Sequence, residues 1–187
     1  CGTTYEAAEL RSPRSKMNPD AEIEIRDTDH FFYRLDRFQD ALEFHANERT
    51  AHWKENVRGM TKQWLDMGLR PRAVTRDLDW GIPLPLEGNE WDGKCVYVWF
   101  EAVIGYLSAS MEWAENTGQP DAWEEFWKPN QSKSYYFIGK DNIPFHTVIW
   151  PAMLMGLGDL NLPWDVPSNE YLTLEGKPFS TSRNWAV

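Results

Sequence analysis

The stretch Lys94-Cys95-Val96-Tyr97-Val98-Trp99-Phe100 decides the fold class. It is apolar almost throughout and rich in β-branched and aromatic residues, which is typical of a strand buried on both faces inside a parallel sheet. Residues 135–138 resemble it and predict a second buried strand, and residues 170–174 predict a third that turns at Glu175-Gly176. Helices are expected over 102–116, over 121–127 and from Pro144 onward, where Pro151 should introduce a kink. This alternation predicts an α/β doubly wound sheet, in which ligands bind at the carboxyl ends of the strands.

The region before this stretch predicts a loop followed by helices. Residues 1–25 hold turn residues without periodicity, and residues 36–46 predict a short helix. Residues 48–67 predict an amphipathic helix, because apolar residues recur there at steps of three and four. These residues are Trp53, Val57, Met60, Trp64 and Met67. Gly68 is well placed to end this helix.

The composition is that of a globular protein, with 42% apolar and 26% charged residues among 187. No apolar run approaches the roughly 18–20 residues of a membrane-spanning helix, so we expect no membrane partner. The N-terminus lacks the layout of a secretion signal, and there are only two cysteines, Cys1 and Cys95. A reducing compartment is therefore expected, and the localisation that we predict is cytoplasmic.

The formal net charge of −10 argues against a surface that binds nucleic acid everywhere, and no DNA partner is expected. The charge is uneven, however, because residues 1–76 balance 13 basic against 13 acidic residues and residues 77–187 carry the whole excess. A loose cationic series lies in the first part: Arg49, Lys54, Arg58, Lys62, Arg70, Arg72 and Arg76. It is either a solvated helix face, which base rates favour, or a patch that meets phosphates.

Two predicted strand exits carry candidate functional residues, over 98–106 and over 137–150. His146 and Trp150 are four residues apart and share a helix face. Together with Trp99 and Tyr106 they could line one aromatic pocket, which would suit a thioether because sulfur packs favourably on aromatic edges. The alternative is that these aromatic residues are ordinary core.

The turn Gly139-Lys140-Asp141 and the polar loop 175–183 are candidate nucleotide contacts. Gly139 permits close backbone approach to a ligand, and Lys140 and Asp141 add one charge of each sign. The loop combines hydroxyls and cations that could close over a polyphosphate. The alternative is a plain surface loop in both cases: composition alone favours it for residues 175–183, and Gly-Lys-Asp is a common loop sequence.

Four long stretches, residues 72–83, 97–110, 136–156 and 169–183, closely resemble the methionyl-tRNA synthetase family of class I aminoacyl-tRNA synthetases, in its bacterial type. The resemblance implies an internal fragment of a longer enzyme. Residues 1–72 would be the C-terminal part of a connective, zinc-knuckle-type insertion. Residues 73–187 would be the second half of a Rossmann-like catalytic domain with a parallel sheet, ending at a KMSKS-like loop.

The resemblance also implies roles for individual residues. The methionine-binding residues would be Trp99, Ala102, Val103, Tyr106, Asn142, His146 and Trp150. The ATP-binding residues would be Gly139, Lys140, Asp141, Lys177, Phe179, Ser180, Thr181 and Ser182. Arg76, in the matched stretch 72–83, and Lys177 and Arg183 would act in catalysis. Pro178 and Thr181 occupy the lysine positions of the KMSKS motif, so Lys177 and Arg183 would have to replace those lysines.

The implied reaction is methionine activation with ATP and Mg²⁺, followed by transfer to tRNA(Met). The full-length protein would hold Zn²⁺, for which Cys1 is a candidate ligand, but its partner cysteines are absent from this sequence. The HIGH motif and an anticodon-binding domain are also absent, so we expect the fragment alone to bind methionine weakly without turnover. Two alternatives stay open: a non-catalytic paralogue that binds methionine or adenylate, and a synthetase for another apolar amino acid.

Overall fold

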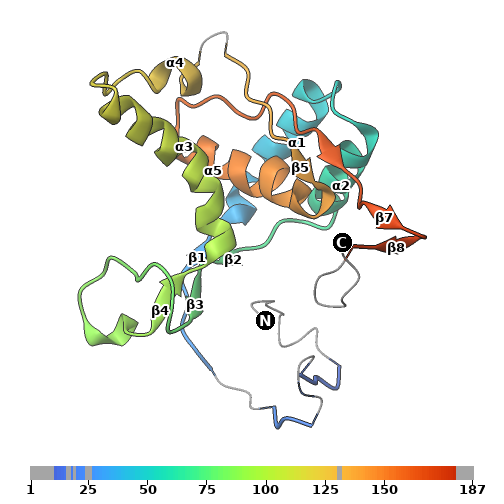
Figure 1. Cartoon of the computed structure of the whole chain (residues 1–187), viewed down its shortest axis with the longest axis vertical. Coiled ribbons are helices and arrows are strands. Elements are labelled where there is room, and N and C mark those ends of the chain that lie inside the picture. The colour runs from blue at the N-terminus through green and yellow to red at the C-terminus, as the bar shows by residue number, and fades with distance from the viewer. Residues whose placement is uncertain (1–10, 16–17, 19, 24–26, 130–131, 180–187) are drawn as a thin grey trace.

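A buried helix lies at the centre of the structure, a computed structural model that describes residues 11–15, 18, 20–23, 27–129 and 132–179 (Figure 1). It begins as a π-helical turn, η5 (Phe145–Ile149), and continues as α5 (Trp150–Leu157). Trp150, Ala152 and Leu154 are completely buried, which fits a segment that is apolar on every side. The irregular turn ends next to Pro151, which has no N–H to donate to the preceding turn. The predicted helix start at Pro144 is confirmed, since Pro144 is the residue that caps η5.

Helices from both sides pack on this central helix. On one side lie α1 (Gln39–Arg49), preceded by the short turn η2 (Leu35–Phe38), and α2 (Glu55–Asp66). On the other side lies α3 (Val98–Asn116), followed by α4 (Glu124–Trp127). The helix predicted over 48–67 is shorter than expected, although Gly68 ends it with a φ of +76° as predicted. Trp53 precedes the helix and is still buried, because its indole nitrogen donates to the carbonyl of Trp164 at 2.7 Å.

A parallel strand pair is present, as the sequence predicts. Strand β5 (Ile138–Gly139) pairs in parallel with β6 (Ser168–Asn169), and a parallel bridge joins Tyr135 to Asp165. The predicted third strand over 170–174 is wrong, because the parallel pairing falls on β6 just before it. Thr173–Leu174 forms β7, which pairs antiparallel with β8 (Lys177–Pro178) across the predicted turn at Glu175-Gly176. Both turn residues have positive φ, +51° and +76°, as tight hairpin turns require.

The buried strand predicted over 94–100 is also wrong in length and type. Only Lys94–Val96 forms a strand, β4, and its partner is the antiparallel β3 (Thr75–Asp77). Helix α3 starts at Val98, so Trp99 and Phe100 are helical. Buried Val103, Leu107 and Ala114 in α3 follow helical spacing, and a short apolar run at a helix start cannot be distinguished from a strand by composition.

The remaining elements are short. Strand β1 (Phe32–Tyr33) pairs antiparallel with β2 (Arg72–Ala73), which the sequence did not predict, and η3 (Asn89–Trp91) and η4 (Lys140–Asn142) are single turns. The described residues thus form an α/β fold with four two-stranded sheets. Within the described ranges, no helix has the length and apolar character needed to cross a membrane.

Candidate functional site

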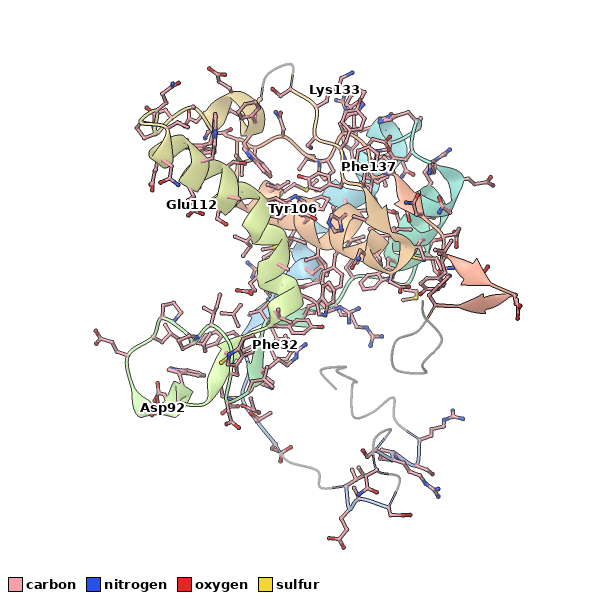
Figure 2. All side chains as sticks on the ribbon, in the orientation of Figure 1. Phe32, Asp92, Tyr106, Glu112, Lys133 and Phe137 are labelled. Carbon is pink, nitrogen blue, oxygen red and sulfur yellow. The ribbon has the colours of Figure 1, made fainter. Side chains whose placement is uncertain are left out.

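A cavity of about 300 Å³ lies between α3 and residues 137–146, a segment that contains β5; we call it the histidine cavity. Its walls come from both predicted strand exits. The lining residues are Trp99, Ala102, Val103, Tyr106, Phe137, Ile138, Gly139, Asn142, Phe145 and His146. Tyr106 and Phe137 are labelled in Figure 2 and come from these two different elements. The structure therefore brings together six of the seven residues that the resemblance assigns to methionine.

A hydrogen-bonded pair gives the histidine cavity its polar edge. His146 is 5% exposed, and its Nε2 lies 2.9 Å from the hydroxyl of Tyr106. Its Nδ1 lies 2.9 Å from the carbonyl oxygen of Asn142. Since a carbonyl only accepts, Nδ1 carries the proton and Nε2 accepts from the tyrosine hydroxyl.

Burial keeps both members of the pair uncharged. Desolvation lowers the pKa of His146 below its ordinary value of 6.5, and this effect outweighs the hydrogen bond to Asn142 that raises it. Desolvation also raises the pKa of Tyr106 above 10.0. The cavity thus presents aromatic and aliphatic walls with a neutral polar edge, which suits an uncharged, polarizable side chain better than an ionic one.

Trp150 does not line the histidine cavity but supports it from behind. It is completely buried, and its ring centroid lies 6.3 Å from that of Tyr106. Its indole N–H donates to the hydroxyl of Tyr136 at 3.0 Å, and its ring meets Trp127 edge-on at 5.8 Å. The sequence correctly places Trp150 on the same helix face as His146, but one packing layer deeper. Conversely, Phe137, Ile138 and Phe145 were missed, although all three belong to the strand exit that was singled out.

The turn with Lys140 and Asp141 is tied to the chain that leads into the β7–β8 hairpin. The ammonium group of Lys140 pairs with Glu170 at 2.6 Å and lies 4.3 Å from the centroid of the Tyr171 ring. The hydroxyl of Tyr171 donates to the carboxylate of Asp141. These four residues, which we call the clasp, connect the edge of the histidine cavity with the hairpin. Hydrogen bonding to Glu170 raises the pKa of Lys140, so the pair stays ionic.

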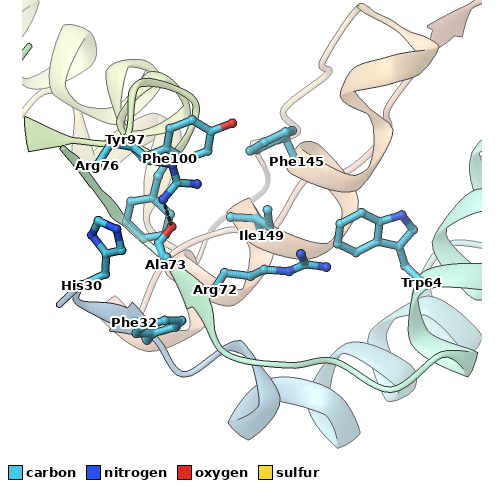
Figure 3. A pocket seen from close by; sticks show the side chains of 10 residues that line it. All are labelled: His30, Phe32, Trp64, Arg72, Ala73, Arg76, Tyr97, Phe100, Phe145 and Ile149. Carbon is cyan, nitrogen blue, oxygen red and sulfur yellow. Dashed lines mark hydrogen bonds between the residues drawn. The ribbon is translucent and has the colours of Figure 1, made fainter. Parts of the chain in front are cut away.

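Arg76 lines a second cavity of about 360 Å³, which we call the arginine cavity (Figure 3). One guanidinium nitrogen of Arg76 donates to the carbonyls of Ala73 at 3.0 Å and Thr75 at 2.6 Å. The guanidinium carbon lies 4.0 Å from the centroid of the Tyr97 ring. Desolvation lowers the pKa of Arg76, but a guanidinium group stays protonated in proteins, so Arg76 remains a cation. Arg76 and His146 thus belong to different cavities, and Phe145 lines both.

The structure describes only some of the residues predicted in the polar loop and as a metal ligand. Phe179 is 37% exposed, and its backbone N–H donates to the carbonyl of Leu172 at 3.3 Å. Lys177 belongs to β8. The remaining predictions, Ser180, Thr181, Ser182, Arg183 and Cys1, lie outside the described residues.

Within the ranges that the structure describes, no three His, Cys, Asp or Glu side chains come together to hold an ion. The described residues therefore do not form a zinc or magnesium centre of their own.

Comparison with known proteins places the chain in a class. The family model described as "tRNA synthetases class I (M)" matches residues 1–187. The chain therefore belongs to this family of class I tRNA synthetases, as the resemblance indicated.

The individual relatives that the chain resembles are methionine–tRNA ligases. The chain is 58% identical, over its full length, to a methionine–tRNA ligase of Dehalococcoides mccartyi, and 53% identical to that of Thermomicrobium roseum. Among solved structures it is similar to Mycobacterium tuberculosis methionyl-tRNA synthetase bound by methionyl-adenylate, with a TM-score of 0.65 and 26% identity over 83% of this chain and 28% of that one. The chain spans about a third of the length of the curated relatives, covering 33% and 32% of these two.

Proposed function

We propose that this chain contributes the methionine-binding half of the active site of a methionine–tRNA ligase. The observation that carries the proposal is the convergence of Trp99, Tyr106 and His146 on one cavity of amino-acid size, with a neutral hydrogen-bonded edge. The thioether of methionine would pack on the rings of Trp99 and Tyr106, and its sulfur, a weak acceptor, needs no charged partner. A charged side chain would find no counter-ion at this edge.

The fold around the site is part of the same proposal. Residues 73–187 would form the second half of a Rossmann-like domain whose parallel sheet includes β5 and β6, and residues 1–72 the end of the connective insertion. The cavity borders the carboxyl end of β5, which is where ligands bind in open parallel sheets. ATP would lie at the adjacent turn of Gly139, Lys140 and Asp141, with Lys177, Phe179 and residues 180–183 closing over its phosphates.

The reaction would need positioning more than acid–base chemistry. The carboxylate of methionine attacks the α-phosphorus of ATP, forming methionyl-adenylate and releasing pyrophosphate, and the methionyl group then passes to the terminal adenosine of tRNA(Met). Mg²⁺ would accompany ATP and neutralise phosphate charge. The chain's own residues would hold the side chain of methionine and keep water away from the acyl phosphate.

Amino-acid-dependent ATP–pyrophosphate exchange by the full-length protein tests the proposal. We expect exchange with methionine and much weaker exchange with leucine or norleucine, although a methylene-sized difference is worth only about 1–3 kcal/mol. The same assay tests the remaining expectation that residues 1–187 alone do not turn over. A full-length protein that binds methionine without any exchange would instead be a non-catalytic paralogue.

A further inference from the structure

Behind the histidine cavity lies a layer of aromatic residues that do not line it. Trp150, Trp127 and Tyr136 are buried there, with 0%, 8% and 7% of their surfaces exposed. A buried indole N–H or phenol hydroxyl needs a hydrogen-bond partner, unlike the side chain of phenylalanine. Each of these residues therefore fixes the position of a neighbour, and the neighbours lead to Tyr106.

One connection runs from α4 to the main chain of Tyr106. The indole N–H of Trp127 donates to the hydroxyl of Ser110 at 2.9 Å. This hydroxyl donates in turn to the carbonyl oxygen of Tyr106 at 3.0 Å, one helical turn earlier in α3. Trp127 is the last residue of α4 and follows Ser110 by 17 positions, so the connection ties α4 to the part of α3 that carries Tyr106 (Figure 1).

A second connection runs from Trp127 to the ring of Tyr106. Trp127 meets the ring of Trp150 edge-on, and the indole N–H of Trp150 donates to the hydroxyl of Tyr136 at 3.0 Å. The ring of Tyr136 meets that of Tyr106 edge-on, with centroids 5.1 Å apart, and its centroid lies 5.5 Å from that of His146. Both connections start at Trp127 and end at Tyr106. We call the four residues that make them the support ring: Ser110, Trp127, Tyr136 and Trp150.

Tyr106 is a residue that needs such support. It is 41% exposed, and its hydroxyl must stay within hydrogen-bond distance of Nε2 of His146 to form the polar edge of the cavity. An exposed side chain on a helix has more than one staggered rotamer open to it. Edge-on aromatic contacts and a fixed main-chain carbonyl favour the one rotamer in which the hydroxyl reaches His146.

We propose that Trp127 and Ser110 are positioning residues of the methionine site, and that α4 thereby sets how closely the cavity fits its amino acid. They hold Tyr106 on His146 from behind, without contact to the ligand. This inference rests on the proposed function, because it concerns the same cavity. A close fit rejects a side chain that is one methylene too long, so a loosened Tyr106 should weaken methionine binding and reduce the discrimination against ethionine, the thioether longer by one methylene.

The test compares Trp127→Phe with Trp113→Phe in the full-length ligase. Trp127→Phe keeps a ring in the core and removes the N–H that donates to Ser110. Trp113 also lies between α3 and α4, with its ring edge-on to Phe126 at 5.9 Å, but it is 47% exposed and is not part of the support ring. It is therefore the matched control.

For Trp127→Phe we expect the KM for methionine in ATP–pyrophosphate exchange to rise roughly 3–10-fold, as for one lost hydrogen bond. The kcat and the KM for ATP should stay at the wild-type level, because the lost contact affects only the binding of the amino acid. The preference for methionine over ethionine should fall several-fold. Trp113→Phe should leave all four quantities unchanged.

Ser110 tests the same hydrogen bond from the other helix. Ser110→Ala removes the acceptor at a half-buried helical position where alanine is favourable, so this variant reports on the bond even if Trp127→Phe unfolds. It should raise the KM for methionine as Trp127→Phe does. Ser110→Thr, which keeps the hydroxyl, should have the wild-type KM.

A double-mutant cycle separates positioning from a general loss of packing. Because Trp127 is proposed to act through the hydroxyl of Tyr106, Trp127→Phe should have no further effect on the KM for methionine in a Tyr106→Phe background, whereas independent effects would multiply. Multiplied effects, an equal rise in Trp113→Phe, a matching rise in the KM for ATP, a wild-type KM in Ser110→Ala, or a raised KM in Ser110→Thr would each overturn the inference. A wild-type enzyme without methionine-dependent exchange would instead refute the proposed function.

Discussion

The hydroxyl of Tyr106 lies 2.9 Å from Nε2 of His146, and the other ring nitrogen of His146 is held by the carbonyl of Asn142. Each group therefore has its hydrogen-bonding role fixed by its neighbour before any ligand arrives. Fixed neutral polar groups inside an aromatic cavity are inexpensive to dehydrate and specific for an uncharged side chain.

Tyr106→Phe should weaken methionine binding in the full-length ligase. The change leaves Nε2 of His146 without its donor at the cavity edge, and a lost hydrogen bond of this kind is worth about 1–2 kcal/mol. The KM for methionine in pyrophosphate exchange should rise by roughly 5–30-fold. Tyr135→Phe is the matched control, because Tyr135 is 50% exposed and does not line the cavity. Equal KM values in both variants would show that the pair does not shape the site.

Tyr171→Phe should act on ATP and not on methionine. Tyr171 holds the carboxylate of Asp141 in the clasp, so loss of its hydroxyl frees the turn on which ATP is proposed to lie. We expect a several-fold higher KM for ATP in exchange, on the order of one lost hydrogen bond, with an unchanged KM for methionine. A parallel rise in both constants would mean that the clasp only stabilises the fold.

Leu154→Ala should destabilise the protein far more than Leu157→Ala. Both residues belong to α5, but Leu154 is completely buried and Leu157 is 66% exposed. The buried substitution should cost about 2–5 kcal/mol and the exposed one less than about 0.5 kcal/mol. Denaturant unfolding followed by tryptophan fluorescence measures both, and similar midpoints for the two variants would contradict the placement of α5 at the centre of the core.

Stability should fall between pH 6.5 and about pH 4 because of His45. Burial, with a smaller contribution from the charge of Arg49, lowers the pKa of His45 from 6.5 to about 4. Between pH 6.5 and 4, His45 is protonated in the unfolded chain but neutral in the folded chain. The stability that neutral His45 permits is therefore complete above pH 6.5 and is lost as the pH falls toward 4. His45→Leu should flatten this part of the profile in urea unfolding. A variant profile as steep as that of the wild type would assign the loss to other groups.

The predictions from the sequence agree best with the structure where the residue type restricts the backbone to one conformation. The hairpin turn at Glu175-Gly176 and the helix stop at Gly68 both need positive φ, and both are present. The strand predicted over 94–100 is wrong because the end of this apolar run is the start of a helix, α3, which begins at Val98. Apolar residues are common in both kinds of element at such a position. The pairing of β1 with β2 joins segments about forty residues apart, so no pattern within either segment of the sequence predicts it.

The site was predicted from two strand exits and a family resemblance, and its geometry needed the structure. Spacing places His146 and Trp150 on one face, but only packing shows that Trp150 lies behind Tyr106 instead of in the cavity wall. Nothing in the sequence indicated the arginine cavity beyond the place of Arg72 and Arg76 in a loose cationic series. Its lining residues Arg72 and Trp64 come from different elements, so no sequence period links them.

The location of the methionine side chain is the central claim, and its most direct measurement is an NMR titration of the full-length ligase with methyl-¹³C methionine. A methyl group packed on the rings of Trp99 and Tyr106 should show an upfield ring-current shift on binding, and Trp99→Leu should remove most of it. A bound methyl group that keeps its free-solution shift, or one whose shift is the same in Trp99→Leu, would contradict this account.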